Sequence, residues 1–116
     1  MKRVEVNDPI ALVKKGIQCI DEGSNKGAVE YFTKAAELGY AEAHYKLSIM
    51  YDGGRGVEKD LKKHVHHLEE AAIGGHHLAR YNLGNHEFRN GRTDRATKHY
   101  IIAAKLGLDD ALECVK

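Results

Sequence analysis

The sequence lacks several features that would define other classes of protein. It has no tryptophan, only one proline (Pro9) and only two cysteines, Cys19 and Cys114, which lie far apart. Two isolated thiols do not make a disulfide framework and are typical of a reducing compartment. No apolar run approaches the roughly 20 residues of a membrane span, and the N-terminus has no apolar core of a signal peptide. We therefore expect a cytoplasmic protein without a membrane segment.

The sequence also has no large excess of charge of either sign. Its 18 basic and 17 acidic residues give a formal net charge of +1. Because binding to nucleic acid or to an anionic membrane usually requires a clear basic excess, we expect neither partner. Strand-like alternation of apolar and polar residues is absent as well, and 116 residues suffice for one domain with a modest core. These absences indicate a single all-α domain over residues 1–116.

What the sequence does contain is a repeated motif of two alanines followed by a glycine. It occurs as Ala35-Ala36-Glu37-Leu38-Gly39, as Ala71-Ala72-Ile73-Gly74-Gly75 and as Ala103-Ala104-Lys105-Leu106-Gly107. The alanine pairs are 36 and then 32 residues apart, a period typical of helical solenoids. Paired alanines let two helices approach closely, and glycine readily adopts the left-handed conformation that ends a helix. We therefore predict that all six alanines are buried and that Gly39, Gly75 and Gly107 each follow a helix end.

The spacing of apolar residues predicts helices on both sides of each alanine motif. Apolar residues recur at three- and four-residue steps, and side chains suited to capping, such as Ser24 and Asp60, precede the predicted starts. The predicted helices cover about 8–22, 26–38, 41–51, 61–73, 77–89 and 93–106, and a partial seventh helix lies within 108–116. Taken in pairs they give three helix–turn–helix repeats at about 8–39, 40–75 and 76–107. The predicted fold is a right-handed α-solenoid.

The second repeat carries the most distinctive pattern. It reads Ala41-Glu42-Ala43-His44-Tyr45-Lys46-Leu47-Ser48, continues with Gly54-Arg55-Gly56-Val57 and ends in its alanine pair. This pattern resembles the Sel1-like repeat family, which is related to tetratricopeptide repeats, and the resemblance extends over nearly all of residues 8–116. It implies a non-catalytic module without a cofactor that binds a protein or peptide on the concave face of the solenoid. The regularity of the repeats also fits a consensus-derived or engineered chain.

The related repeats line their concave face with the first helix of each pair. By register, these positions correspond to ten candidate partner-binding residues: Ile10, Val13, Ile17, Glu42, Tyr45, Ile49, Leu78, Tyr81, Asn85 and Phe88. Exposed aromatic and aliphatic side chains rimmed by polar groups suit a peptide-binding surface. The alternative is that several of these side chains are buried between neighbouring helices.

Histidines suggest metal binding as a second function, because five of the eight lie between residues 64 and 77. His64 and His67 are three residues apart on one helix face, a spacing that can chelate zinc. His76 and His77 follow after the glycine break. However, His67 takes the position that Tyr31 has in the first repeat, so an imidazole in an aromatic packing position is the simpler interpretation. No HExxH or CxxC motif is present.

The C-terminal end of the repeats has a further consequence for assembly. Repeat proteins bury the apolar side of each unit against the next one. The short predicted helix after the third repeat offers only a few apolar residues to cover it: Leu108, Ala111, Leu112 and Val115. We therefore expect self-association through this end, either end to end or as a symmetric dimer. An adequately capped monomer is the alternative.

Overall fold

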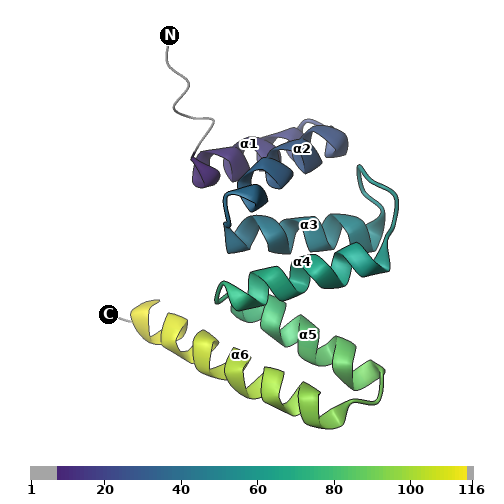
Figure 1. Cartoon of the computed structure of the whole chain (residues 1–116). Coiled ribbons are helices and arrows are strands. Elements are labelled where there is room, and N and C mark those ends of the chain that lie inside the picture. Colours follow the sequence, from purple (N-terminus) through teal and green to yellow (C-terminus); the bar gives the residue numbers. More distant parts are fainter. Residues whose placement is uncertain (1–7, 115–116) are drawn as a thin grey trace.

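The computed structural model describes residues 8–114, and describes side chains as far as residue 107. Within this range the chain forms six helices and no strand: α1 (Pro9–Asp21), α2 (Asn25–Glu37), α3 (Ala41–Gly53), α4 (Leu61–Ile73), α5 (His77–Arg89) and α6 (Thr93–Cys114). Figure 1 shows them as three antiparallel pairs stacked in chain order. No helix in residues 8–114 has the length and apolar character needed to cross a membrane. The predicted all-α repeat architecture is confirmed.

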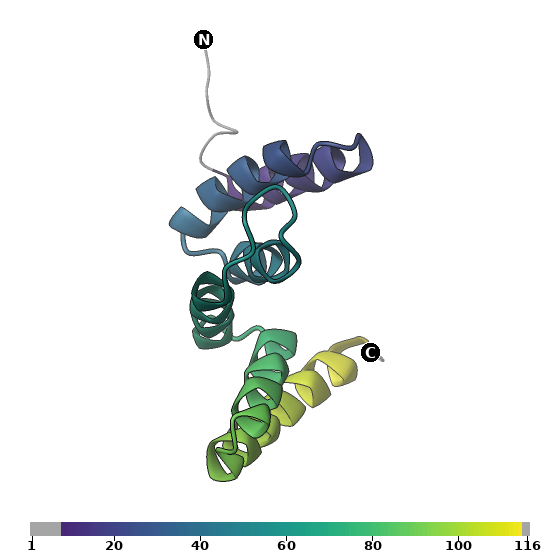
Figure 2. The same cartoon turned by 90° about the vertical axis from the view of Figure 1, so that its right-hand side faces the viewer.

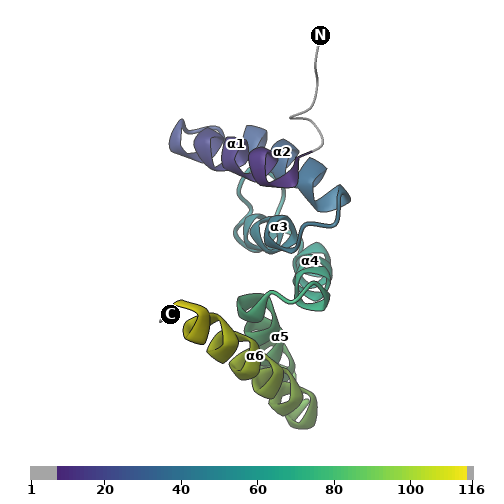
Figure 3. The same ribbon diagram turned by 90° about the vertical axis from the view of Figure 1, so that its left-hand side faces the viewer.

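Successive helix pairs are rotated relative to one another along the stack. In Figure 2 the second pair is seen almost end-on, whereas the first pair lies across the view and the third runs obliquely. Figure 3 shows the same rotation from the opposite side. The chain forms a short solenoid in which the main contacts are between consecutive helices.

Helices α1, α2 and α4 begin where a polar side chain accepts a hydrogen bond from a free backbone N–H group. Asp8, Ser24 and Asp60 each accept one from an amide two or three residues further on, at 3.0–3.2 Å. The first amides of a helix have no partner within the helix, so such caps stabilise it. Ser24 and Asp60 are capping residues that the sequence suggests.

Glycine ends the first two repeats as predicted. Gly39 has φ of 86° and Gly75 has φ of 91°, and both positions are open to solvent on the side where a Cβ would lie. A residue with a Cβ is strained in this left-handed conformation. The turn at each glycine lets the next helix begin two residues later and fold back onto the preceding pair.

For the third glycine, Gly107, the prediction of a helix end is wrong. α6 runs through Gly107 without a break and continues to Cys114. The residues assigned to a partial seventh helix therefore extend α6 as far as the structure describes them. Glycine permits the left-handed turn but does not enforce it, since it also adopts helical dihedral angles. The predicted packing of Leu108, Ala111, Leu112 and Val115 lies outside the described side chains.

The core consists of the alanine pairs and a few larger apolar side chains. One cluster joins α1, α2 and α3 around Phe32 and Leu47, and a second joins α4 and α5 around Leu68 and Leu83. Five of the six motif alanines are at most 6% exposed, as predicted. The exception is Ala104, which is exposed because an open groove lies over it.

A small residue in the middle of each first helix lets its partner helix approach closely. A Cβ at Gly16 would lie 2.4 Å from the ring of Phe32, and a Cβ at Gly84 would lie 2.6 Å from the ring of Tyr100. Ser48 has the same position in α3, where it is fully buried and its hydroxyl donates to a carbonyl three residues earlier at 2.7 Å. The aromatic rings of α2 and α6 thus pack directly against the backbone of their partner helices.

Candidate functional site

The candidate partner-binding residues lie on the first helices of the pairs, and most of the apolar ones are at the surface. Six have at least 39% of their surface exposed: Ile10, Ile17, Ile49, Leu78, Tyr81 and Phe88. Glu42, Tyr45 and Asn85 are half-buried. Val13 is buried in the first core cluster, so for this residue the alternative of burial between helices holds. We use the term apolar stripe for the six exposed residues.

Polar groups border the apolar stripe where α3 meets the start of α5. Glu42 pairs with Lys46 at 3.2 Å and accepts a hydrogen bond from His76 Nε2 at 2.8 Å. The other ring nitrogen of His76 accepts from the Ala79 amide at 3.2 Å, which places the proton on Nε2. The Tyr45 ring stacks on His76 with 4.3 Å between the ring centroids. His76 thus caps α5 and ties it to α3, and both of its nitrogens are used.

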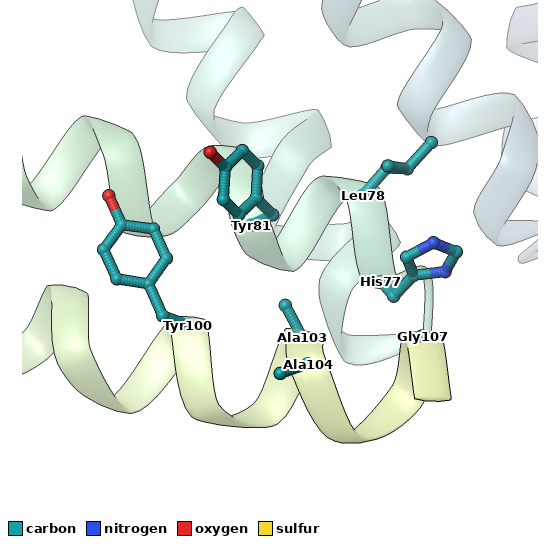
Figure 4. A pocket seen from close by; sticks show the side chains of 7 residues that line it. All are labelled: His77, Leu78, Tyr81, Tyr100, Ala103, Ala104 and Gly107. Atoms are coloured by element: carbon teal, nitrogen blue, oxygen red, sulfur yellow. The ribbon is translucent and has the colours of Figure 1, made fainter. Parts of the chain in front are cut away.

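A groove between α5 and α6 lies beside the apolar stripe. It has a volume of about 710 Å³ and is lined by His77, Leu78, Tyr81, Tyr100, Ala103, Ala104 and Gly107. Figure 4 shows these side chains, with Leu78 and Tyr81 projecting from α5 and Tyr100 and the two alanines from α6. We refer to it as the α5–α6 groove. Its lining is mainly apolar, which suits an apolar side chain or a helix as the occupant.

One wall of the α5–α6 groove is aromatic and is held in place by a hydrogen bond. The rings of Tyr81 and Tyr100 lie 5.5 Å apart and are tilted by 46°, an arrangement favoured by aromatic pairs. The Tyr100 hydroxyl donates to Asn85 Oδ1 at 2.6 Å. The role of Asn85 in this structure is to orient Tyr100. Tyr81 is half exposed, and its ring forms part of the groove surface.

The four histidines considered as metal ligands are not brought together around one point. His64 donates from Nδ1 to the Ser48 carbonyl at 2.8 Å, His67 lies 2.9 Å from His44, and His76 is engaged as described above. His77 stacks on His76, with 6.4 Å between their rings. Among the described residues, no group of three or more histidine, cysteine or acidic side chains is arranged to hold a metal ion.

The geometry shows instead a histidine pair between α3 and α4. His44 Nδ1 and His67 Nδ1 lie 2.9 Å apart, so one ring donates and the other accepts. The His67 ring also stacks on Tyr51, nearly parallel to it at 5.7 Å. Partial burial, reinforced by His44, His66 and Lys63, lowers the pKa of His67 to about 4. Burial also lowers the pKa of His44, against the opposing effect of Glu70.

The partner of His67 was missed by the sequence reasoning, although the register contains it. Leu12, His44 and Arg80 have the same position in α1, α3 and α5, and the second helices have a shared position of their own at Tyr31, His67 and His99. In the first repeat, Leu12 belongs to the apolar cluster of α1–α3 and Tyr31 packs against it. In the third repeat, Arg80 Nη1 lies 3.3 Å from His99 Nδ1, and Arg80 Nη2 donates to the Ala72 carbonyl at 3.3 Å. The same contact between paired helices is therefore apolar in the first repeat and polar in the other two.

Comparison with known proteins agrees with this repeat geometry. The Sel1 repeat model matches residues 15–40, 41–76 and 77–108, which are three consecutive units. The chain belongs to the Sel1 repeat family. The three matches coincide with the three helix pairs and their joints. Thus the family is established over most of the chain, from the second half of α1 onward.

Curated relatives share these repeats over short stretches. DAP3-binding cell death enhancer 1 of Rattus norvegicus is 41% identical over 50 residues, which are 43% of this chain and 10% of that protein. Chitin synthase regulatory factor 4 of Schizosaccharomyces pombe is 32% identical over 84 residues, which are 72% of this chain and 13% of that protein. The Sel1 repeat chain thus spans only about a tenth of the length of these relatives.

Solved structures of Sel1 repeat proteins have the same fold. A Sel1 repeat protein from Oxalobacter formigenes superposes with a TM-score of 0.75 and 26% identity, over 86% of this chain and 44% of that one. A protective antigen of uropathogenic Escherichia coli that displays the same type of fold superposes with a TM-score of 0.78 and 28% identity, over 90% of this chain and 24% of that one. The solenoid architecture is therefore shared with proteins of known structure.

Proposed function

We propose that this Sel1 repeat chain is a protein-interaction module that binds a peptide or a partner domain along the apolar stripe. The observation that carries the proposal is the exposure of large apolar side chains on one helix, where Leu78, Tyr81 and Phe88 are 47%, 50% and 60% exposed. Isolated apolar side chains are ordinary on a protein surface, but a contiguous set bordered by polar groups marks an interaction site. The ion pairs of Glu42 supply such a border on α3.

The names of the relatives agree with this role. One is named as a DAP3-binding protein and another as a chitin synthase regulatory factor. Their shared segments are repeats of the kind described here, and repeat solenoids present extended surfaces suited to protein partners. Because this chain spans only about a tenth of those proteins, the identity of its own partner does not follow from their names.

The test is affinity capture followed by direct binding measurements on the captured protein. Tyr81→Ser and Phe88→Ser each remove an aromatic side chain from the apolar stripe, and each should weaken binding by about tenfold or more, as aromatic side chains dominate interface energetics. Ile73→Ser is the matched control, since Ile73 is 76% exposed but lies on α4 outside the stripe. Equal affinities for all three variants would reject the apolar stripe as the binding surface.

Zinc binding is distinguished from this function by calorimetry. A partner that binds through the apolar stripe does so with the same affinity in the presence and absence of a chelator. Zinc titrated into the protein should give no heat beyond dilution if the histidines serve only in packing. A stoichiometric zinc isotherm that disappears in His67→Tyr would establish the metal-binding alternative.

A further inference from the structure

The α5–α6 groove occupies a position that is filled in the two preceding repeats. Ala36 and Ala72 correspond to Ala104 by register, and they are only 6% and 1% exposed. Ala36 lies in the cluster of α1–α3, and Ala72 lies in the cluster of α4 and α5, so each is covered by the first helix of the next repeat. Ala104 alone is exposed. The groove is thus the place where a first helix of the same kind would pack.

The helices that fill the earlier positions share a simple pattern. α3 contributes Ala43 and Leu47 to the first cluster, and α5 contributes Ala79 and Leu83 to the second. In both helices an alanine and a larger apolar residue are four positions apart, which places them on one face, one turn from each other. All four side chains are at most 4% exposed. The groove therefore selects for an alanine followed four residues later by an aliphatic side chain.

The same pattern occurs in this chain immediately after Gly107. Ala111 follows Gly107 at the distance at which Ala43 follows Gly39 and Ala79 follows Gly75, and Val115 stands in the register of Leu47 and Leu83. In the first two repeats the left-handed glycine turns the following helix back into its own groove. In the third, α6 continues straight through Gly107. As far as residue 114, the chain after Gly107 thus continues along the helix and does not turn back into the groove.

We propose that the α5–α6 groove binds the 108–116 segment of a second copy of this chain, in a reciprocal two-fold dimer. Each copy then supplies a groove and a segment, so that both grooves are filled by the helix pattern that fills the two preceding positions. Exchange of an identical element between copies is a common route to symmetric dimers, because the contacts within one chain are reused between two. Leu78 and Tyr81 line this groove, so dimerisation competes with any partner that binds there. The inference does not depend on the proposed function.

The first test is the mass in solution as a function of concentration. Sedimentation velocity of the full chain should show the 12.9 kDa monomer at low concentration and a species of twice that mass at high concentration. Ala104→Glu places a charge on the exposed groove floor and should raise the dissociation constant about tenfold or more, because burying an unpaired carboxylate is unfavourable. Ile101→Glu is the matched control on the same helix, since Ile101 is exposed but does not line the groove. It should change the constant less than about twofold.

The second test locates the segment of one copy in the groove of the other. One chain contains no isotope label and carries Cys19→Ser and a spin label on Cys114. It is mixed with an isotope-labelled chain that has no spin label and carries Cys19→Ser and Cys114→Ser. We expect intermolecular broadening of amide signals centred on Tyr81 and Ala104, with Gly23 at the far end of the solenoid unaffected. Circular dichroism confirms that each variant remains folded.

Three outcomes would overturn the proposal. A monomer at every concentration, with groove broadening only in a separate sample in which the isotope-labelled chain itself carries the spin label on Cys114, would show that each chain folds back into its own groove. A dimer without groove broadening, or one equally weakened by Ala104→Glu and Ile101→Glu, would show that the copies associate through another surface. Monomers without groove broadening of either kind would leave the groove to a foreign partner and reject its occupation by this chain.

Discussion

The histidine pair between α3 and α4 predicts a protein that loses stability in mild acid. In the folded chain, burial and the neighbouring His44, His66 and Lys63 lower the pKa of His67 from 6.5 to about 4. Above pH 6.5 the imidazole is uncharged in both the folded and the unfolded chain. Between pH 6.5 and about 4 the unfolded chain binds a proton that the folded chain does not, so the free energy of unfolding falls as the pH falls.

The size of this effect follows from the shift and from the exposure of the ring. A pKa lowered from 6.5 to about 4 corresponds to roughly 3.4 kcal/mol, at about 1.36 kcal/mol for each tenfold change in proton affinity. The His67 ring is only half-buried, so solvent screens its interactions, and we expect about 1–1.5 kcal/mol. Burial also lowers the pKa of His44 and of His99, the latter with help from Arg80, so both add to the loss in the same direction.

The assay is urea unfolding followed by circular dichroism at pH 7.5 and pH 5. His67→Tyr introduces the residue that the first repeat has at this position, Tyr31, and removes the titrating group. The loss of stability between the two pH values should be about 1 kcal/mol smaller in this variant than in the wild type. His86→Gln controls for the loss of one histidine outside the pair and should leave the wild-type loss in place. An equal pH dependence of wild type and His67→Tyr would refute the reasoning.

Three further predictions concern the packing of the repeats and are checked by urea unfolding at neutral pH. Gly39→Ala should destabilise the fold by about 1 kcal/mol, because φ is positive at this position. Gly107→Ala should stabilise the fold by up to about 1 kcal/mol, because this glycine lies inside a helix. Effects of the same sign would contradict the different backbone conformations of the two glycines. Gly84→Ala should cost about 1–3 kcal/mol, since its Cβ would lie 2.6 Å from the Tyr100 ring. An unchanged midpoint would mean that the ring moves aside freely. Ala71→Leu should also cost about 1–3 kcal/mol, because Ala71 is fully buried, and a wild-type urea midpoint would show that the position can expand.

The sequence predicted the helices and their pairing because the information is local. Apolar spacing, capping residues and the alanine–glycine motif act within one or two turns, and the structure has helices at each predicted pair with ends shifted by a few residues at most before Gly107. Gly107 was predicted wrongly because a glycine allows a turn and a helix alike. The choice between them depends on whether the following segment packs back, which is a tertiary property.

The candidate site was less accessible to sequence reasoning, for the same reason. Register identified the stripe positions, but it did not distinguish Val13, which is buried by the neighbouring helices, from Tyr81, which is half exposed. It also treated Ala104 like Ala72, although only Ala72 has a helix over it. The exposure of a side chain in a solenoid depends on the next unit along the stack, so it cannot be obtained from one repeat alone.

The change from an apolar to a polar contact between paired helices has a consequence for how the solenoid unfolds. The first helix pair, α1–α2, contributes to the larger apolar cluster. The second, α3–α4, has His44 and His67 at its contact. The third, α5–α6, has Arg80, whose Nε is buried with no hydrogen-bond acceptor among the described residues. In a repeat protein the stability of each unit is largely its own plus that of its neighbouring interfaces. Protection of backbone amides against hydrogen exchange should therefore decrease from α1–α2 toward α5–α6. The chain would open from its C-terminal pair, and mild acid would extend this opening into α3–α4 while the first pair stays closed.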